Sequence, residues 1–300
     1  MSKKILSVVL ALTIMLAIAP VSVFAQDDVL SHLTYEINNG EVTISACDES
    51  ISGDVIIPDT IDGYPVTTIG EWAFGEHESL ITVTIPESVT LIGIGAFILC
   101  YNLEYITVDE NNLYYSSDEY GVLFNKNKTE LIQYPAGNSR TTYTIPDSVM
   151  TIGTGAFVYS QNLKSVTIAN GVTLIDDTAF ATCISLESVT IPESVTSIGI
   201  GAFAECISIT DVYYGGSEAD WADITTAEEN ECLTSATIHY NYIIDEPATE
   251  DPETDEPVTE ENINTDNNNT SESDSSFLGR IIEFFINLLE KIRQFFESVI

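Results

Sequence analysis

The chain has 300 residues, is 44% hydrophobic and carries a formal net charge of −38. A surface this acidic repels nucleic acid phosphates and anionic lipid headgroups, so the composition disfavours both as partners. The length has room for two ordinary domains, although an array of repeats can grow lengthwise as one unit.

Residues 1–25 have the pattern of a secretory signal. Lys3 and Lys4 give a basic start, residues 5–18 are apolar, and a run of small and apolar residues ends at Ala25. This order predicts cleavage after Ala25 and export of the chain. A retained membrane helix is the alternative, which the polar residues directly after Ala25 disfavour.

Residues 33–44 alternate apolar and polar side chains on either side of Asn38, Asn39 and Gly40. This pattern is typical of a β-hairpin. We expect the hairpin, with residues 53–65, to cover the end of an array of repeats that follows, because terminal repeats are usually atypical.

Four stretches of 23 residues can be aligned without a gap: residues 80–102, 140–162, 163–185 and 186–208. Their Ala-Phe pairs end at equivalent positions, namely Phe97, Phe157, Phe180 and Phe203. A fixed period of this length is typical of a solenoid, in which one coil buries its apolar face only against its neighbours.

A single repeat explains the coil. In residues 186–191, apolar residues alternate with Ser188 and Thr190, which predicts a strand with one buried face. Pro192 ends that strand, Gly199 and Gly201 permit a tight corner, and about one helical turn follows at residues 202–206. Stacked coils would place equivalent strands in a parallel sheet and Phe203 in an aromatic ladder.

The pattern L-x-x-V-x-I-P-x-x-V-x-x-I-G-x-x-A-F-x-x-C resembles the bacterial surface-antigen (BspA-type) leucine-rich repeats over roughly residues 33–242. The resemblance implies a leucine-rich repeat solenoid, mostly β, with a parallel sheet and short helical turns. It also implies an exported or surface-exposed, generally non-enzymatic protein of a kind linked to adhesion or host-protein binding. Residues 169–170 and 176–177 depart from the pattern.

Residues 103–139 form an insert that exceeds one repeat by 14 residues. Residues 122–124 and 131–134 flank a polar segment, which predicts a projecting hairpin. Insertions in repeat arrays often lie on the binding face. The tyrosines gathered in this region could therefore contact a ligand, or they could pack the longer coil against its neighbours.

The array is expected to end near residue 242, after a short helix capped by Ser217 and a closing strand at residues 236–240. Residues 243–276 are acidic and almost free of apolar side chains, which predicts a disordered linker. Residues 277–300 predict an amphipathic helix that attaches to a membrane surface or envelope, or self-associates. Its apolar face consists of Leu278, Ile281, Phe285, Leu288, Ile292, Phe295 and Val299.

Five cysteines are present, and Cys100, Cys183 and Cys206 follow the repeat phenylalanine by three residues. A thiol fixed to the repeat phase is best explained as a small buried group that fills the coil. Pairing of Cys183 with Cys206 on adjacent coils is the alternative. The spacing of cysteine and histidine gives no support for a metal site, and no cofactor is expected.

Catalysis is not expected, because His32, His77 and His239 have no nucleophile fixed beside them in the sequence. The best candidate for a ligand face is the outward strand positions, which carry hydroxyl and tyrosine side chains. These residues are Thr82, Thr84, Tyr105, Thr107, Ser165, Thr167, Ser188, Thr190 and Tyr213. They predict a secreted or cell-surface binding or adhesion module for an unknown protein or glycan. The alternative is a structural envelope spacer or self-associating surface protein without a dedicated ligand.

Overall fold

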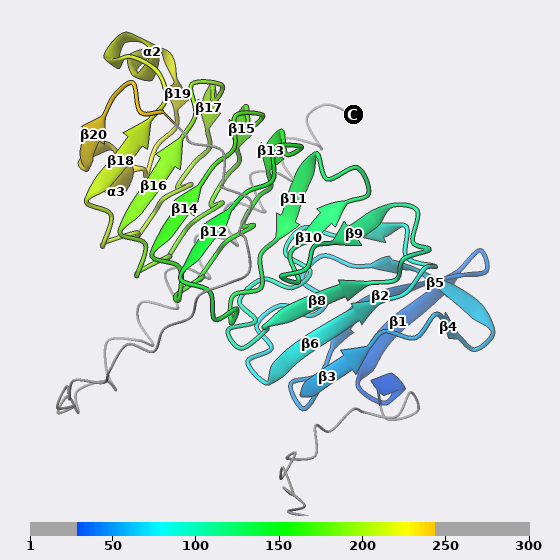
Figure 1. The fold of residues 1–300 in the computed structure, drawn as a ribbon. Helices are drawn as coiled ribbons and strands as arrows, with labels where there is room; N and C mark the ends of the chain where they lie inside the picture. The colour runs from blue at the N-terminus through cyan, green and yellow to red at the C-terminus, as the bar shows by residue number, and fades with distance from the viewer. Residues whose placement is uncertain (1–28, 244–300) are drawn as a thin grey trace, which may run out of the picture. The chain divides into compact units, whose positions relative to one another are not determined.

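The computed structural model describes residues 29–243. They form coils, most of them with two short strands separated by turns, and equivalent strands of most consecutive coils pair in parallel (Figure 1). This arrangement confirms the predicted solenoid. We number the coils 1 (residues 53–79), 2 (80–102), 3 (103–139), 4 (140–162), 5 (163–185) and 6 (186–208). The signal predicted at residues 1–25, the linker beyond residue 243 and the helix predicted at 277–300 lie outside the described residues.

The first strands of the coils form two separate parallel sheets. One contains β3 (Gly53–Ile56), β6 (Leu80–Ile85) and β8 (Tyr105–Val108). The other contains β12 (Thr142–Thr144), β14 (Ser165–Thr167), β16 (Ser188–Ile191), β18 (Asp211–Tyr214) and β20 (Thr237–His239). The register in coils 4 to 6 follows the repeat, so that Val166 pairs with Val189.

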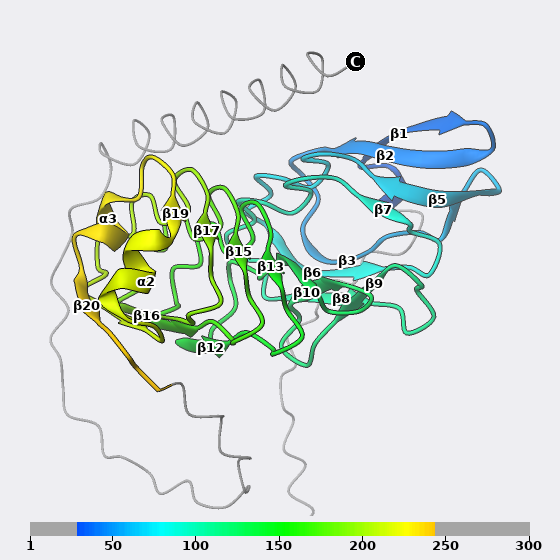
Figure 2. The same ribbon diagram turned by 90° about the horizontal axis from the view of Figure 1, so that it is seen from above.

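The second strands are also divided between two sheets. One contains β1 (Leu33–Asn38), β2 (Glu41–Cys47), β4 (Thr60–Ile61), β5 (Tyr64–Ile69) and β7 (Leu91–Ile92). The other runs in the order β19 (Thr225–Thr226), β17 (Ser197–Ile198), β15 (Leu174–Ile175), β13 (Thr151–Ile152), β11 (Glu130–Gln133), β10 (Leu123–Asn125) and β9 (Tyr115–Ser117). Figure 2 shows β13, β15, β17 and β19 following one another along the array.

Both ends of the array are covered, although residues 53–65, which the sequence predicts as part of the first cover, belong to coil 1 because β3 pairs with β6. β1 and β2 form an antiparallel hairpin whose turn places Asn39 and Gly40 at positive φ, 55° and 85°. At the other end Ser217 caps α2 (Glu218–Asp223) through a capping box with Asp220. After α3 (Glu231–Thr234), β20 pairs with β18 and closes the first-strand sheet.

The insert is one enlarged coil. Its predicted hairpin is present between β10 and β11, but it does not project, because β11 also pairs with β13 of coil 4. Leu123, Phe124 and Leu131 are fully buried. Tyr134 takes the place of the repeat phenylalanine, with its ring centroid 5.0 Å from that of Phe157.

The predicted aromatic ladder is confirmed in coils 3 to 6. Phe157 and Phe180 have ring centroids 4.6 Å apart, and Phe180 and Phe203 are 4.9 Å apart. Phe74 and Phe97 form a shorter stack in coils 1 and 2. The buried apolar residues divide into two clusters at the same point, so coil 3 joins two cores.

Every coil except coil 3 turns its corner with two left-handed residues, placed two before and two after the aromatic residue. In coil 6 these are Gly201 (φ 57°) and Glu205 (φ 57°). The first of these positions is glycine in coils 2, 4 and 6, but it is Thr178 (φ 54°) in coil 5. A β-branched residue is strained in this conformation. The Thr178 hydroxyl is also buried without a hydrogen-bond partner among the described residues.

We therefore expect Thr178→Gly to raise the free energy of unfolding by about 1 kcal/mol. The substitution removes about 1–2 kcal/mol of left-handed strain and a buried unpaired hydroxyl, offset in part by lost packing. Thermal unfolding of the full chain, followed by circular dichroism, measures the change. Gly201→Thr makes the reverse exchange at the same position of coil 6 and should lower stability. A loss of stability in both variants would contradict this account of the corner.

The cysteines that follow the repeat phase fill the coils, as predicted. The thiols of Cys100, Cys183 and Cys206 are buried, and each donates a hydrogen bond to a carbonyl of the preceding coil at 2.9–3.1 Å. The alternative disulfide is not formed, because all five cysteines are free. Each thiol therefore serves as a small core group that also pairs a carbonyl oxygen.

Cys47, on β2, lies beside a histidine. Its Sγ is 3.1 Å from Nε2 of His77, while Nδ1 of His77 is 2.7 Å from the Gly75 carbonyl oxygen. Burial, and to a smaller extent the nearby Cys100 and Asp48, raise the pKa of Cys47 to about 12. The thiol is therefore protonated at neutral pH and is a poor nucleophile.

We expect Cys47 in the native chain to react with iodoacetamide at pH 8 at least about 100-fold more slowly than free cysteine. A pKa near 12 leaves only about one thiol in 10,000 ionised at that pH. Alkylation followed by peptide mass spectrometry measures the rate, with the denatured chain as the reference. His77→Ala should not slow the reaction; if it did, His77 would be activating the thiol.

Candidate functional site

The outer surface of the sheet β12–β14–β16–β18–β20 is the strongest candidate for a binding site. Alternate side chains of these strands point inward, as with the buried Val166, Val189 and Val212. The remaining side chains form two rows set by the strand register. We call them the hydroxyl face: Thr142, Ser165, Ser188, Asp211 and Thr237 in one row, and Thr144, Thr167, Thr190, Tyr213 and His239 in the other.

Five of the nine residues predicted for the ligand face lie on the hydroxyl face: Ser165, Thr167, Ser188, Thr190 and Tyr213. Thr82, Thr84, Tyr105 and Thr107 belong to the separate sheet of β6 and β8. The two sheets are not joined, because segment 117–121 of the insert occupies the free edge of β8. Ile106 N donates to Gly121 O at 3.1 Å, and Val108 N donates to Ser117 Oγ at 3.1 Å. The nine candidate residues therefore lie on two separate sheets.

Tyr105 is engaged by the insert. Its hydroxyl donates to the Glu119 carbonyl oxygen at 2.9 Å. Its ring lies so close to Gly121 that a Cβ there would be 2.6 Å from the ring. On the same sheet, Thr82 Oγ1 donates to Asp54 Oδ1 at 2.8 Å. Thus Tyr105 and Thr82 have structural partners, which weakens the case for these two as ligand contacts.

The hydroxyls of the hydroxyl face differ from the others of the repeat in their hydrogen bonding. Within residues 29–243, the seven serine and threonine hydroxyls of this face make no hydrogen bond to the protein. Other threonines of the same coils do. The Oγ1 atoms of Thr173, Thr196 and Thr210 donate to carbonyls one coil earlier, at 3.2–3.4 Å. The seven hydroxyls are therefore left to bond with solvent or a partner.

An aromatic cluster ends the hydroxyl face. The Tyr213 ring stacks on His239, with centroids 4.8 Å apart and planes 15° apart, and it also contacts Tyr242 at 4.8 Å. His239 Nε2 lies 2.7 Å from Asp211 Oδ1. Hydrogen bonds from His239 and then from Thr210 lower the pKa of Asp211, so the single carboxylate of the face is ionised and paired. This end offers flat aromatic surface beside a fixed acceptor.

Five residues at this face were not predicted from the sequence: Thr142, Thr144, Thr237, His239 and Tyr242. The first two stand 23 residues before Ser165 and Thr167, so the aligned repeats contain the signal for them. The other three follow the last regular repeat. His239 stands 26 residues after Tyr213, outside the 23-residue phase, and only the pairing of β18 with β20 brings it to the face.

The histidines have closer neighbours than the sequence suggests, which corrects the expectation that no nucleophile lies beside them. His32 Nδ1 is 3.1 Å from Asp48 Oδ1 and 3.0 Å from Ser50 Oγ. Both contacts fall on the same ring nitrogen, so the imidazole cannot take a proton on one nitrogen while the carboxylate orients the other. At the other pair, the Cys47 thiol is protonated. Neither arrangement has the geometry or ionisation of a catalytic site.

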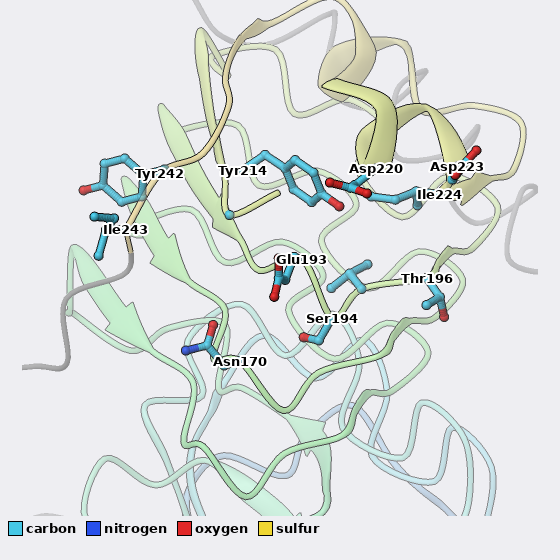
Figure 3. Close-up of a pocket in the computed structure, with 12 residues that line it drawn as sticks. Asn170, Glu193, Ser194, Thr196, Tyr214, Asp220, Asp223, Ile224, Tyr242 and Ile243 are labelled. Atoms are coloured by element: carbon cyan, nitrogen blue, oxygen red, sulfur yellow. The ribbon is translucent and has the colours of Figure 1, made fainter. Parts of the chain in front are cut away.

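A groove of about 730 Å³ lies beside the closing cap, along the turns that follow the first strands of coils 5 and 6. Figure 3 shows that it is bounded by α2, by the turns after β14 and β16, and by residues 242–243. Its carboxylates are Glu193, Asp220 and Asp223, with no basic residue among the lining groups. The Asp220 carboxylate already accepts the Ser217 N–H and hydroxyl as part of the helix cap. The groove therefore repels anions. One of its three carboxylates, that of Asp220, is already bound in the cap of α2.

Residues 29–243 contain no group of three or more His, Cys, Asp or Glu side chains placed to hold a metal ion. In the same range no helix combines the length and apolar character needed to cross a membrane.

Solved structures of several bacterial proteins are similar to this chain, and three of them follow. A leucine-rich repeat protein from Eubacterium ventriosum is 25% identical, with a TM-score of 0.48 over 63% of this chain and 72% of that one. The pneumococcal vaccine antigen PcpA is 21% identical, with a TM-score of 0.47 over 61% of this chain and 50% of that one. A leucine rich cell surface protein from Faecalibacterium prausnitzii is 26% identical, with a TM-score of 0.37 over 60% and 64%. The chain thus spans half of the pneumococcal protein and under two thirds of the last.

No curated protein matches the chain. The sequence matches the family described as "BspA type Leucine rich repeat region" in six copies, over residues 45–136 and 136–218. These residues make up more than half of the chain and include coils 2 to 6 with the predicted repeat motif. The chain therefore belongs to the BspA-type leucine-rich repeat family.

Proposed function

We propose that this protein is an exported, non-enzymatic binding module whose hydroxyl face contacts a protein or a glycan. The observation that carries the proposal is the set of seven unpaired serine and threonine hydroxyls on that face. A hydroxyl both donates and accepts, so the rows can bond with peptide groups or sugar hydroxyls. The rings of Tyr213 and His239 add apolar contact area at one end.

The charge of the hydroxyl face suits this role. Asp211 is its single carboxylate, and that group is paired with His239. Lys164 and Glu187 lie one position before the strands and form an exposed ion pair at 3.3 Å. A nearly neutral surface on so acidic a chain allows a partner to approach without strong repulsion at the contact itself.

Export and attachment are the second part of the proposal. The basic and apolar pattern of residues 1–25 supports secretion. The periodic apolar face of residues 277–300 supports contact with an envelope or membrane surface, or self-association. Fractionation of cells that express the full chain, or the chain without residues 277–300, tests the attachment. Loss of envelope association with continued secretion would support it, and unchanged distribution would oppose it.

We expect the double variant Thr167→Lys/Thr190→Lys to lose at least tenfold in binding to the ligand of the hydroxyl face. Two long, charged side chains would replace adjacent hydroxyls in the centre of one row. The measurement screens the full chain on an immobilised glycan array and a panel of purified extracellular proteins, and then titrates each positive ligand by surface plasmon resonance.

Thr173→Lys/Thr196→Lys is the matched control. These threonines lie in the same two coils, are exposed, and place their hydroxyls on another side of the coil. The control should bind as the parent does, and both variants should unfold at similar temperatures. Equal binding by both variants would exclude the hydroxyl face, and a chain without any ligand would favour a structural spacer.

A further inference from the structure

A regular ladder of backbone hydrogen bonds joins the corners of adjacent coils. In coil 5 the N–H groups of Thr178, Phe180 and Thr182 donate to carbonyls of coil 6 at 2.7–2.9 Å. Coil 4 repeats the pattern from Gly155, Phe157 and Tyr159, and coil 1 repeats it from Trp72, Phe74 and Glu76. The aromatic residue and the left-handed residues on either side of it therefore direct their N–H groups at the next coil.

Coil 2 breaks this ladder. Its equivalent N–H groups belong to Gly95, Phe97 and Leu99, and none of them has an acceptor within residues 29–243. Phe97 and Leu99 are buried. An unpaired buried N–H costs free energy, and such groups are rare in folded proteins. Three unpaired N–H groups in one corner, two of them on buried residues and all at equivalent positions of the ladder, point to an absent acceptor chain.

The cause lies in coil 3. Its corner carries Gln133 and Tyr134 in place of the Ala-Phe pair, followed by Pro135, and none of its carbonyls accepts an N–H group of the coil 2 corner. Side chains of the coil 2 corner instead contact coil 4 directly. The Tyr101 and Tyr159 rings are 4.2 Å apart, and Ile98 Cδ1 would lie 2.9 Å from a Cβ on Gly155.

A groove of about 370 Å³ opens at this break, within the size range of small ligand sites. Gly95, Ala96 and Phe97 line it on one side. Apolar side chains on both sides contribute to the lining, namely Ile92, Ile94 and Ile132. β7 pairs with β5 alone among the described strands, and on its other edge the Ile92 N–H donates to the Tyr115 hydroxyl of the insert at 2.9 Å, so the open backbone donors of the groove are those of the corner.

The groove also carries negative charge. Glu130 and Asp176 line it, and no basic residue does. Burial, and then the neighbouring Asp176, raise the pKa of Glu130. A bound cation would relieve the repulsion between these carboxylates. The nearby Lys126 does not supply it, because its ammonium group donates to the carbonyl oxygens of Glu110 and Asn112.

We propose that this groove binds an extended peptide segment that carries a lysine or arginine. Carbonyl oxygens of the peptide accept the N–H groups of Gly95 and Phe97, which restores the missing rungs of the ladder by strand addition. Its apolar side chains contact Ile92, Ile94 and Ile132, and its basic side chain pairs with Glu130 and Asp176. The site is separate from the hydroxyl face, which is formed by first strands of coils 4 to 6 and the closing cap.

The test uses the full chain and a fluorescein-labelled, amidated hexapeptide of sequence Val-Thr-Val-Lys-Val-Thr, followed by fluorescence anisotropy. The same peptide with glutamate in place of lysine should bind at least tenfold more weakly. Thr90→Arg places a cation at the groove and should weaken the lysine peptide at least tenfold, since Thr90 is exposed and lines the groove. Thr173→Arg is the matched control at the equivalent exposed position of coil 5 and should change nothing.

Hydrogen exchange provides a readout of the backbone bonds themselves. Adding the lysine peptide should slow exchange in the fragment that contains Gly95 and Phe97, and leave the equivalent fragment around Phe180 unchanged. The proposal is overturned if the chain does not bind the lysine peptide at millimolar concentration, which would leave water as the acceptor of these N–H groups. Equal affinity for both peptides, equal loss in both arginine variants, or unchanged exchange at Gly95 and Phe97 would overturn it as well.

Discussion

The hydrogen bonds between adjacent coils fix the spacing on which the rest of the structure depends. Paired strands lie about 4.8 Å apart, and in coils 1, 4 and 5 the corner N–H ladder holds the third side of the coil at the same repeat. The ring centroids from Tyr134 to Phe203 follow at 4.6–5.0 Å, so the aromatic stack adopts the spacing of the backbone. The buried cysteine thiols add further hydrogen bonds between adjacent coils. Cys100, Cys183 and Cys206 each donate to a carbonyl oxygen of the preceding coil.

This constraint explains which parts of the fold were predictable. A residue type that returns every 23 positions must meet its own copy in the next coil, so Phe157, Phe180 and Phe203 had to stack. Coil 3 has no such copy, and neither the place of Tyr134 in the stack nor the engagement of Tyr105 by Gly121 could be read from spacing. The division of the nine candidate ligand residues between two sheets could not be read from spacing either, because segment 117–121 of the insert, and not a strand of coil 4, borders β8.

The proximity of His32 to Ser50 and of Cys47 to His77 was also invisible, because these contacts join segments outside the regular phase. Their chemistry nevertheless follows from local geometry once they are placed. Two partners on one imidazole nitrogen hold a ring in position, and a thiol removed from water stays protonated. Both pairs lie in the N-terminal part of the array and join the first cap, or β2, to neighbouring segments. We interpret them as contacts that hold this cap in place.

A repeat protein allows structural and available polar groups to be told apart by comparing equivalent positions. Thr173 and Thr196 occupy one position of coils 5 and 6, and their hydroxyls donate hydrogen bonds to carbonyls of the preceding coil. Thr167 and Thr190 occupy another position, and their hydroxyls make no such bond among the described residues. Threonine suits an exposed strand in either case, so composition alone cannot separate them. The same comparison singles out the N–H groups of Gly95, Phe97 and Leu99, whose counterparts in coils 1, 4 and 5 are paired. Unused hydrogen-bonding capacity of two kinds thus gathers on two different sides of the coils, and a partner that satisfies one set leaves the other free.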